Sequence, residues 1–209
     1  MSNRSILSIA AATAAVAVLG ASPVVAQSSD SINVANVRAA WELVLPTGSL
    51  FPTGAQRNDI KRGGISAIQL SYVPRSSLAF TATVGWARTR DLAASNAPKL
   101  NVFTYDVGAE LRAQRRSLVR SLTIMPFAGV GAGARSYDYR GLKADATHNA
   151  TAYASAGAEL GMRRVRLRLD VRDYVSGSKS LVSEGMASAP NGGTRNDVVF
   201  MAGLRLVRR

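Results

Sequence analysis

Charged and aliphatic side chains alternate without interruption between residues 165 and 172. The aliphatic positions are Val165, Leu167, Leu169 and Val171, and those between them hold Arg166, Arg168, Asp170 and Arg172. A period of two places these sets on opposite faces of a β-strand. Guanidinium and carboxylate groups pair strongly, so the charged face could bind an ion, line a pore or fill a polar interior. The rest of the chain decides between these uses.

Further ionisable residues occupy equivalent positions in other alternating segments. The complete set expected on the inner, charged faces is Arg38, Glu42, Asp106, Glu110, Arg112, Arg135, Glu159, Arg166, Arg168, Asp170, Arg172 and Arg205. An unpaired charge at low dielectric is costly, so each carboxylate is expected to contact an arginine. This set would either line a gated pore or plug a narrow interior, and a plug is favoured because side chains can fill so small a barrel.

Eight segments in all have the alternation and length of strands. They centre on residues 37–45, 67–72, 78–87, 103–112, 122–137, 151–160, 165–172 and 198–206. Their connections alternate between long and short, and Pro46 is expected to end the first strand and begin a loop that runs to about Gly63. Strands of about 10 residues, even in number, with short turns at one rim and long loops at the other, are typical of a transmembrane barrel. A soluble sandwich has no reason to sort its loops by length.

Composition bounds the setting of this fold. Arg4 and the apolar run 6–21, followed by small residues up to Ala26, predict a cleaved secretory signal peptide over residues 1–26, although an uncleaved anchor is the alternative. A short polar leader over 27–33 and a barrel over 34–209 follow. The chain has no cysteine, hence no disulfide. Its formal charge of +13 could attract nucleic acid, but export and the scattering of arginines at alternate strand positions argue against that partner.

Aromatic residues fall at two heights of the expected strands. Tyr72 and Phe80 flank the first short turn, whereas Trp86, Phe103 and Phe200 lie near long loops. Membrane barrels carry aromatic girdles at both interfaces, and these five residues predict them. The alternative, that they are ordinary core residues, holds only for a soluble protein.

The whole pattern resembles the outer-membrane β-barrel domain family, the small eight-stranded barrels of the OmpA and OmpX type. The similarity covers residues 34–207 and is clearest in 153–175 and in the glycine-rich run 126–133. It implies an all-β, eight-stranded antiparallel up-and-down transmembrane barrel in the bacterial outer membrane. Such barrels usually end in an aromatic residue that the assembly machinery reads, whereas this sequence ends in two arginines after Val207.

Catalysis finds little support in the sequence. His148 is the sole histidine and is expected at a solvated loop edge, and Ala150 stands where a lipid A deacylase-like pattern would need serine. The run from Gly129 to Ala134 mimics a dinucleotide fingerprint, but no helix signal follows it. No catalytic residue, cofactor site or metal site is therefore expected.

Arginines gather at the expected short turns, where no acid separates them. They are Arg75, Arg115, Arg116, Arg120, Arg163, Arg164, Arg208 and Arg209. They would either contact anionic headgroups of the inner leaflet or simply keep this rim soluble. The partners expected overall are outer-membrane lipids, lipopolysaccharide and, during insertion, the barrel-assembly machinery, for a chain that is monomeric.

The sequence thus favours a non-enzymatic outer-membrane barrel with a filled lumen and a structural or surface-interaction role. A narrow porin-like channel is the alternative, and a barrel enzyme that modifies lipid A is the third hypothesis.

The facing assigned to residues 165–172 can be tested with two substitutions. Leu167→Arg is expected to hinder insertion, because an arginine on the lipid face costs about 2–4 kcal/mol near the bilayer midplane. Arg168→Gln, on the inner face, should insert far better. The folded fraction of each, measured by heat-modifiable gel mobility, checks this, and equal yields would contradict the facing.

Overall fold

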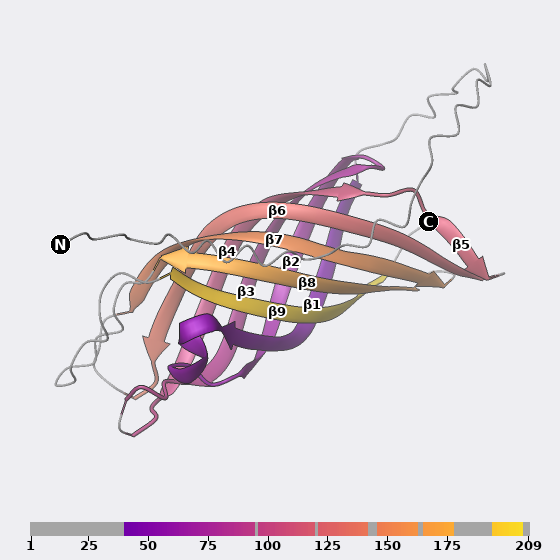
Figure 1. Ribbon diagram of the computed structural model, residues 1–209. Coiled ribbons are helices and arrows are strands. Elements are labelled where there is room, and N and C mark those ends of the chain that lie inside the picture. Colours follow the sequence, from indigo (N-terminus) through magenta and orange to yellow (C-terminus); the bar gives the residue numbers. More distant parts are fainter. Residues whose placement is uncertain are drawn as a thin grey trace, which may run out of the picture. The chain divides into compact units, whose positions relative to one another are not determined.

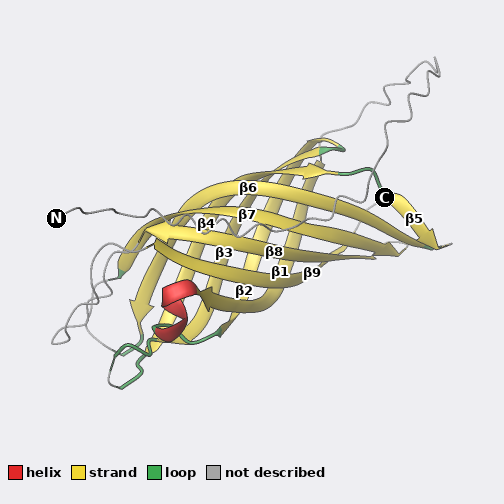
Figure 2. Cartoon of the chain, in the orientation of Figure 1, coloured by secondary structure: helices red, strands yellow, loops and turns green. Residues whose placement is uncertain are grey.

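The computed structural model describes residues 40–94, 96–119, 121–141, 146–162, 165–177 and 194–206. Within them, strands and one short 3-10 helix are the regular elements (Figures 1 and 2). The strands are β1 (Ala40–Thr53), β2 (Gly63–Arg75), β3 (Leu78–Arg90), β4 (Lys99–Arg112), β5 (Arg116–Val119), β6 (Leu122–Tyr139), β7 (Thr147–Met162), β8 (Val165–Gly177) and β9 (Thr194–Leu206), and the helix is η1 (Gly54–Asn58). No helix in this part of the chain is long and apolar enough to span a membrane.

The strands form one closed antiparallel barrel. The order of hydrogen-bonded neighbours is β4-β3-β2-β1-β9-β8-β7-β6-β5, and pairing of β4 with β6 closes the ring. The short β5 pairs with β6 and lies outside the ring. Eight strands therefore make the barrel, and the predicted all-β, eight-stranded up-and-down topology is confirmed.

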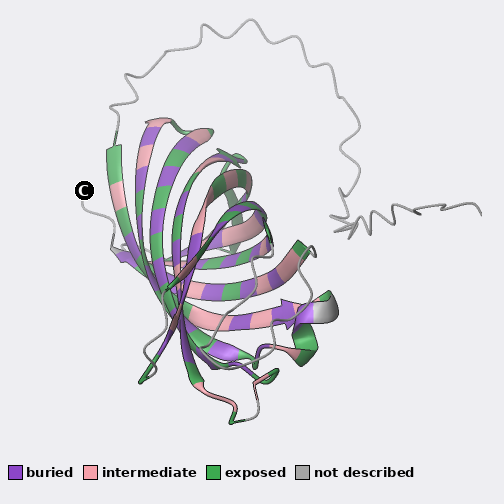
Figure 3. Ribbon diagram, turned by 90° about the vertical axis from the view of Figure 1, so that its left-hand side faces the viewer, coloured by how far each residue is buried: buried purple, intermediate pink, exposed green. Residues whose placement is uncertain are grey.

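Burial alternates along the strands, as the period of two predicts (Figure 3). In β3 every second residue from Ala79 to Thr89 is buried, while the residues between them face outward. The outward side chains are large and apolar: Trp41 is 68 % exposed, Val107 65 % and Leu111 69 %. An apolar outer surface of this extent is unusual for a soluble monomer. The buried charged side chains, such as Arg168, Asp170 and Glu110, lie on the opposite, inner face.

The prediction that Pro46 ends the first strand is wrong. β1 continues to Thr53, and η1 occupies part of the expected loop. Proline cannot donate a ladder hydrogen bond. The pairing of β1 with β2 is accordingly interrupted between Val44 and Thr47, yet the register is the same on both sides. Opposite Pro46 on β9 stands Gly203, where a Cβ would lie only 3.0 Å from the Cα of Pro46.

Other boundaries also differ from expectation at the loop end. β3 extends to Arg90, β7 begins at Thr147 and β9 at Thr194, so the connections are shorter than predicted. His148 consequently lies within β7 and not at a loop edge. Hydrogen-bonded strand pairing extends beyond the strand ends that the turn-forming residues of the sequence predicted. The predicted signal peptide and polar leader lie outside the described residues.

Close approach of β4 to β6 depends on glycine. A Cβ at Gly133 would overlap the Tyr105 carbonyl oxygen and lie 2.7 Å from Asp106 Oδ1. The carbonyl belongs to the backbone of the neighbouring strand and cannot move aside without breaking the ladder.

Gly133→Ala is therefore expected to lower the free energy of unfolding by about 1–3 kcal/mol, as overpacking typically does. Gly177→Ala is the matched control, since no heavy atom lies within 4 Å of a Cβ there. Urea unfolding of the barrel in detergent measures both. Equal midpoints for the two variants would contradict the role assigned to Gly133.

Candidate functional site in the barrel lumen

Ten charged side chains form one connected network in the lumen. Five are arginines and five are carboxylates: Arg112, Arg166, Arg168, Arg172 and Arg205, with Glu42, Asp106, Glu110, Glu159 and Asp170. All were expected there from the sequence. Alternation along β1, β4, β7, β8 and β9 turns them inward, and closure of the barrel brings them together. Of the two remaining predicted residues, Arg38 lies outside the described residues, and Arg135 forms a separate ion pair.

Glu42 and Glu159 connect the arginines at the turn end of the network. Arg112 Nη1 lies 2.9 Å from Glu42 Oε2, and Arg205 contacts the same carboxylate oxygen. Arg205 Nη2 also donates to Glu159 Oε2 at 2.8 Å, while Arg166 reaches Glu159 at 3.8 Å. Each carboxylate thus serves more than one arginine.

Arg168 occupies the middle of the network. Its guanidinium donates to both oxygens of Glu110, and it lies 3.6 Å from Glu159 and 3.4 Å from Asp170. Its Cζ sits 3.8 Å from the centroid of the Phe127 ring. The aromatic ring and the carboxylates therefore replace the water that this guanidinium loses on burial.

Arg172 links the charged part of the lumen to neutral polar groups. It donates to Asp170 Oδ2 at 3.1 Å, to Gln69 Oε1 at 2.6 Å and to Thr83 Oγ1 at 3.2 Å. The hydroxyl of Tyr174 donates to Asp106 Oδ2 at 2.6 Å. Side chains from β2, β3, β4 and β8 therefore meet across the lumen at this level.

A further buried ion pair joins Arg135 of β6 to Asp197 of β9. Arg135 was predicted to face inward, but Asp197 was missed. The expected loop ended at Asn196, although the inward positions Val199 and Met201 continue in steps of two to residue 197. The two side chains are 0 % and 2 % exposed, and the Arg135 Cζ lies 4.2 Å from the Tyr174 ring centroid.

The loop-end part of the lumen contains an apolar cluster that the sequence did not predict. Its buried side chains include Leu50, Ile65, Leu100, Val102, Tyr137, Tyr139, Tyr153, Tyr174, Val199 and Met201. The rings of Tyr153 and Tyr174 pack 5.2 Å apart. Nearest the loops, the Tyr139 hydroxyl donates to the buried carboxylate of Asp91. An apolar, aromatic layer thus lies above the charged network.

A cavity of 330 Å³ lies at the other, turn end of the lumen. Glu42, Arg112 and Arg166 line it together with turn residues such as Ser77 and Arg115. Arg166 borders this cavity, and its side chain is 18 % exposed, far more than that of Arg168. Water can therefore approach the network from the turn end.

The five predicted girdle residues lie on the outer face, though unequally exposed. Phe80 is 50 %, Phe200 47 % and Trp86 37 % exposed, while Tyr72 and Phe103 are partly covered. At the turn end the ring of Trp41 packs 5.1 Å from that of Tyr72. Trp41 is 68 % exposed and extends this aromatic group, although the prediction did not include it.

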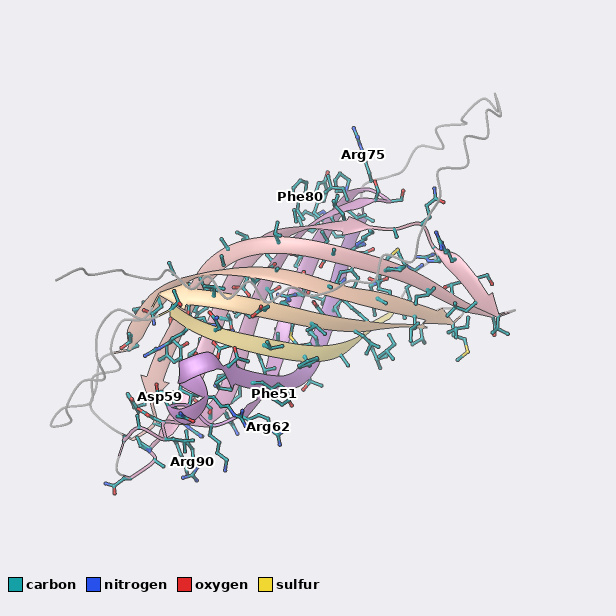
Figure 4. The ribbon with its side chains drawn as sticks, viewed as in Figure 1. Phe51, Asp59, Arg62, Arg75, Phe80 and Arg90 are labelled. Atoms are coloured by element: carbon teal, nitrogen blue, oxygen red, sulfur yellow. The ribbon has the colours of Figure 1, made fainter. Side chains whose placement is uncertain are left out.

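The basic turn rim is described in part. Arg75, Arg115 and Arg116 are exposed there, and the other five arginines of the predicted set lie outside the described residues. Figure 4 shows Arg75 and Phe80 at the same end of the barrel, opposite Asp59, Arg62 and Arg90.

His148 has a partner but not a complete catalytic group. Its Nδ1 lies 2.7 Å from the Oγ of Ser136 on the neighbouring strand. Ser136 is 6 % exposed, and no contact joins His148 to an acid among the described residues. No group of three or more potential metal ligands occurs in that part of the chain either.

Comparison with solved structures places this fold among outer-membrane barrels. Neisserial surface protein A is similar with a TM-score of 0.58 at 13 % identity, over 81 % of this chain and 99 % of the other. The Ail attachment invasion protein of Yersinia pestis gives 0.42 at 10 % identity, over 79 % and 96 %. The outer-membrane protein AlkL gives 0.48 at 11 % identity, over 88 % and 97 %. No protein-family model matches the sequence, and comparison with curated proteins finds no match.

The Arg135–Asp197 pair allows a clean test of lumen energetics. Arg135→Met is expected to cost about 3–5 kcal/mol of unfolding free energy, because it leaves Asp197 charged and unpaired in the interior. The double variant Arg135→Met/Asp197→Leu should recover most of that loss. Urea unfolding of the single and double variants measures the coupling, and additive losses would contradict a direct pair.

Proposed function

We propose that this protein is a non-enzymatic β-barrel of the bacterial outer membrane, with a structural or surface-interaction role and a lumen that does not conduct. The observation that carries the proposal is the filling of the lumen. Five arginines and five carboxylates neutralise one another in a connected network, and the aromatic layer lies between that network and the loops.

The outer surface supports the membrane location. Large apolar side chains stand exposed around the ring, among them Leu43 on β1, Val130 on β6 and Leu204 on β9. Burying such side chains in lipid is favourable by roughly 1.5–3 kcal/mol each. The shared fold with Neisserial surface protein A agrees with this location. Insertion would involve the barrel-assembly machinery, and the inserted chain is proposed to be a monomer among outer-membrane lipids and lipopolysaccharide.

A narrow channel is the competing function, and the water-accessible turn end favours it locally. The cavity beside Arg166 reaches the charged network, but Tyr153 and Tyr174 pack against each other between that level and the loop end. An ion that entered from the turns would have to displace these rings and leave its water behind. A lipid A-modifying enzyme has weaker support, since the Ser136–His148 pair has no acid partner among the described residues.

Planar-bilayer recordings test the closed lumen. The unaltered protein is expected to give no stable single-channel steps, because the ion pairs and the aromatic layer leave no wet path. Tyr153→Ala/Tyr174→Ala should produce steps, since it removes two adjacent rings. Phe80→Ala, an aromatic truncation on the outer face, is the control and should stay silent.

Stable steps from the unaltered protein, abolished by Arg172→Gln, would instead assign a channel.

A further inference from the structure

Three cations stand side by side on the outer surface at the loop end. Arg90 of β3 lies directly opposite Lys99 of β4, and the backbone N–H of Arg140, just after β6, donates to the Lys99 carbonyl at 2.9 Å. All three residues are exposed. Like charges directly opposite one another destabilise a sheet, so this row favours an anion that would neutralise it.

The described residues supply no ion-paired anion to this row, although Asp138 stands two residues before Arg140 on the same face of β6. None of the ion pairs among the described residues involves Arg90, Lys99 or Arg140. Asp91 follows Arg90 but is buried and accepts the hydrogen bond of Tyr139. The Arg90 guanidinium makes one long hydrogen bond, 3.5 Å to the carbonyl of Ala97. Its remaining N–H groups are available to a ligand.

Along the outer face of β3, the residues change from basic to aromatic to aliphatic with distance from the loop end. From the loop end they are Arg90, Arg88, Trp86, Val84 and Ala82. Arg88 stacks 4.1 Å above the Trp86 ring centroid, and Trp86 stands opposite Phe103 of β4. Membrane barrels carry girdles of aromatic residues at both interfaces, so the cation row lies at headgroup height.

Below the aromatic pair the outer face is hollowed. A hollow of 590 Å³ runs over β2, β3, β4 and β6, between the exposed side chains of Ile68, Val84, Tyr105 and Val107, with the small Ala82 and Ala132 at its floor. Arg90 and Val84 are six residues apart, which corresponds to about 20 Å along a strand. With a strand tilt of about 45°, roughly 14 Å of depth separates the cations from the hollow.

We propose that this strip binds one phosphorylated, acylated glycolipid of the outer leaflet, lipopolysaccharide, through its lipid A part. Phosphate oxygens lie against Arg90, Lys99 and Arg140, where guanidinium groups bind phosphate by paired hydrogen bonds. An acyl chain lies in the hollow below Trp86. The site rests on the proposed outer-membrane location and adds to it a specific position for one lipid.

A lipid accounts for the strip better than a soluble polyanion does. A soluble polyanion would use the cations alone, whereas the aromatic pair and the hollow continue down the lipid-facing surface of the same strands. Figure 4 shows Arg90 and Arg62 at the end of the barrel opposite Arg75. The turn-end arginines therefore offer a matched set of charges at the other membrane surface.

Native mass spectrometry of the full chain in detergent, titrated with phosphorylated lipid A, tests the site. Arg90→Gln/Lys99→Gln/Arg140→Gln is expected to weaken binding at least tenfold. Arg75→Gln/Arg115→Gln/Arg116→Gln removes the same charge from the turn end and should bind as the unaltered protein does. Dephosphorylated lipid A should bind the unaltered protein at least tenfold more weakly, and this arm requires no variant.

A second pair of variants tests the hollow. Ala82→Phe fills its floor and should weaken lipid A binding without affecting binding of inorganic phosphate. Ala202→Phe, outward on β9, should leave both unchanged. Heat-modifiable mobility and insertion into vesicles are measured for each variant, so that a misfolded barrel is recognised.

Equal affinity of the loop-end and turn-end variants, or equal binding of dephosphorylated lipid A, would overturn the site. Inorganic phosphate competing as strongly as lipid A would assign the cations to a free ion and also overturn it. If the loop-end triple variant lost binding of a heparin fragment but not of lipid A, the cations would be assigned to a soluble polyanion instead. Failure of the unaltered chain to insert into vesicles would count against the proposed membrane location, a separate result.

Discussion

The free energy of burying charge in a narrow barrel governs the rest of this structure. A guanidinium such as that of Arg168, 2 % exposed, is tolerable only where carboxylates replace the water it has lost. Glu110, Glu159 and Asp170 do so from three different strands. The network therefore requires the ring to close in one register, because a shift of one strand by one residue would turn the charges of that strand outward.

The charge balance of the molecule follows from this requirement. The lumen network holds equal numbers of arginines and carboxylates, whereas the whole chain carries a formal charge of +13. The excess positive charge is consequently found elsewhere, and part of it is exposed at the two rims, as Arg75 and Arg115 at the turns and Arg90 and Lys99 at the loops. Interior charge is paired within the lumen, whereas the rim charge is exposed.

The lumen is divided into two levels that serve different purposes. The charged level reaches the water-accessible turn end beside Arg166. Above it, Tyr153 and Tyr174 pack against each other, Arg135 stacks on the Tyr174 ring, and nearest the loops Tyr139 donates to Asp91. The aromatic layer excludes water because its apolar surface is buried. The lower local dielectric that results strengthens the ion pairs next to it. The proposed closed lumen therefore rests on both levels.

The sequence by itself determined the strand count, the facing of each strand and the inward position of charges such as Arg172 and Glu159, because a period of two is a local property of the backbone. It could not determine which charges meet: the partners Arg112 and Glu42 are 70 residues apart and are joined only when the ring closes. Asp197 was missed because local turn residues obscured the strand end. Pro46 continues a strand because Gly203 on the neighbouring strand leaves room for it, and the cation row exists only because register places Arg90 beside Lys99. Such contacts depend on strand pairing, and the register that sets them is a property of the whole barrel.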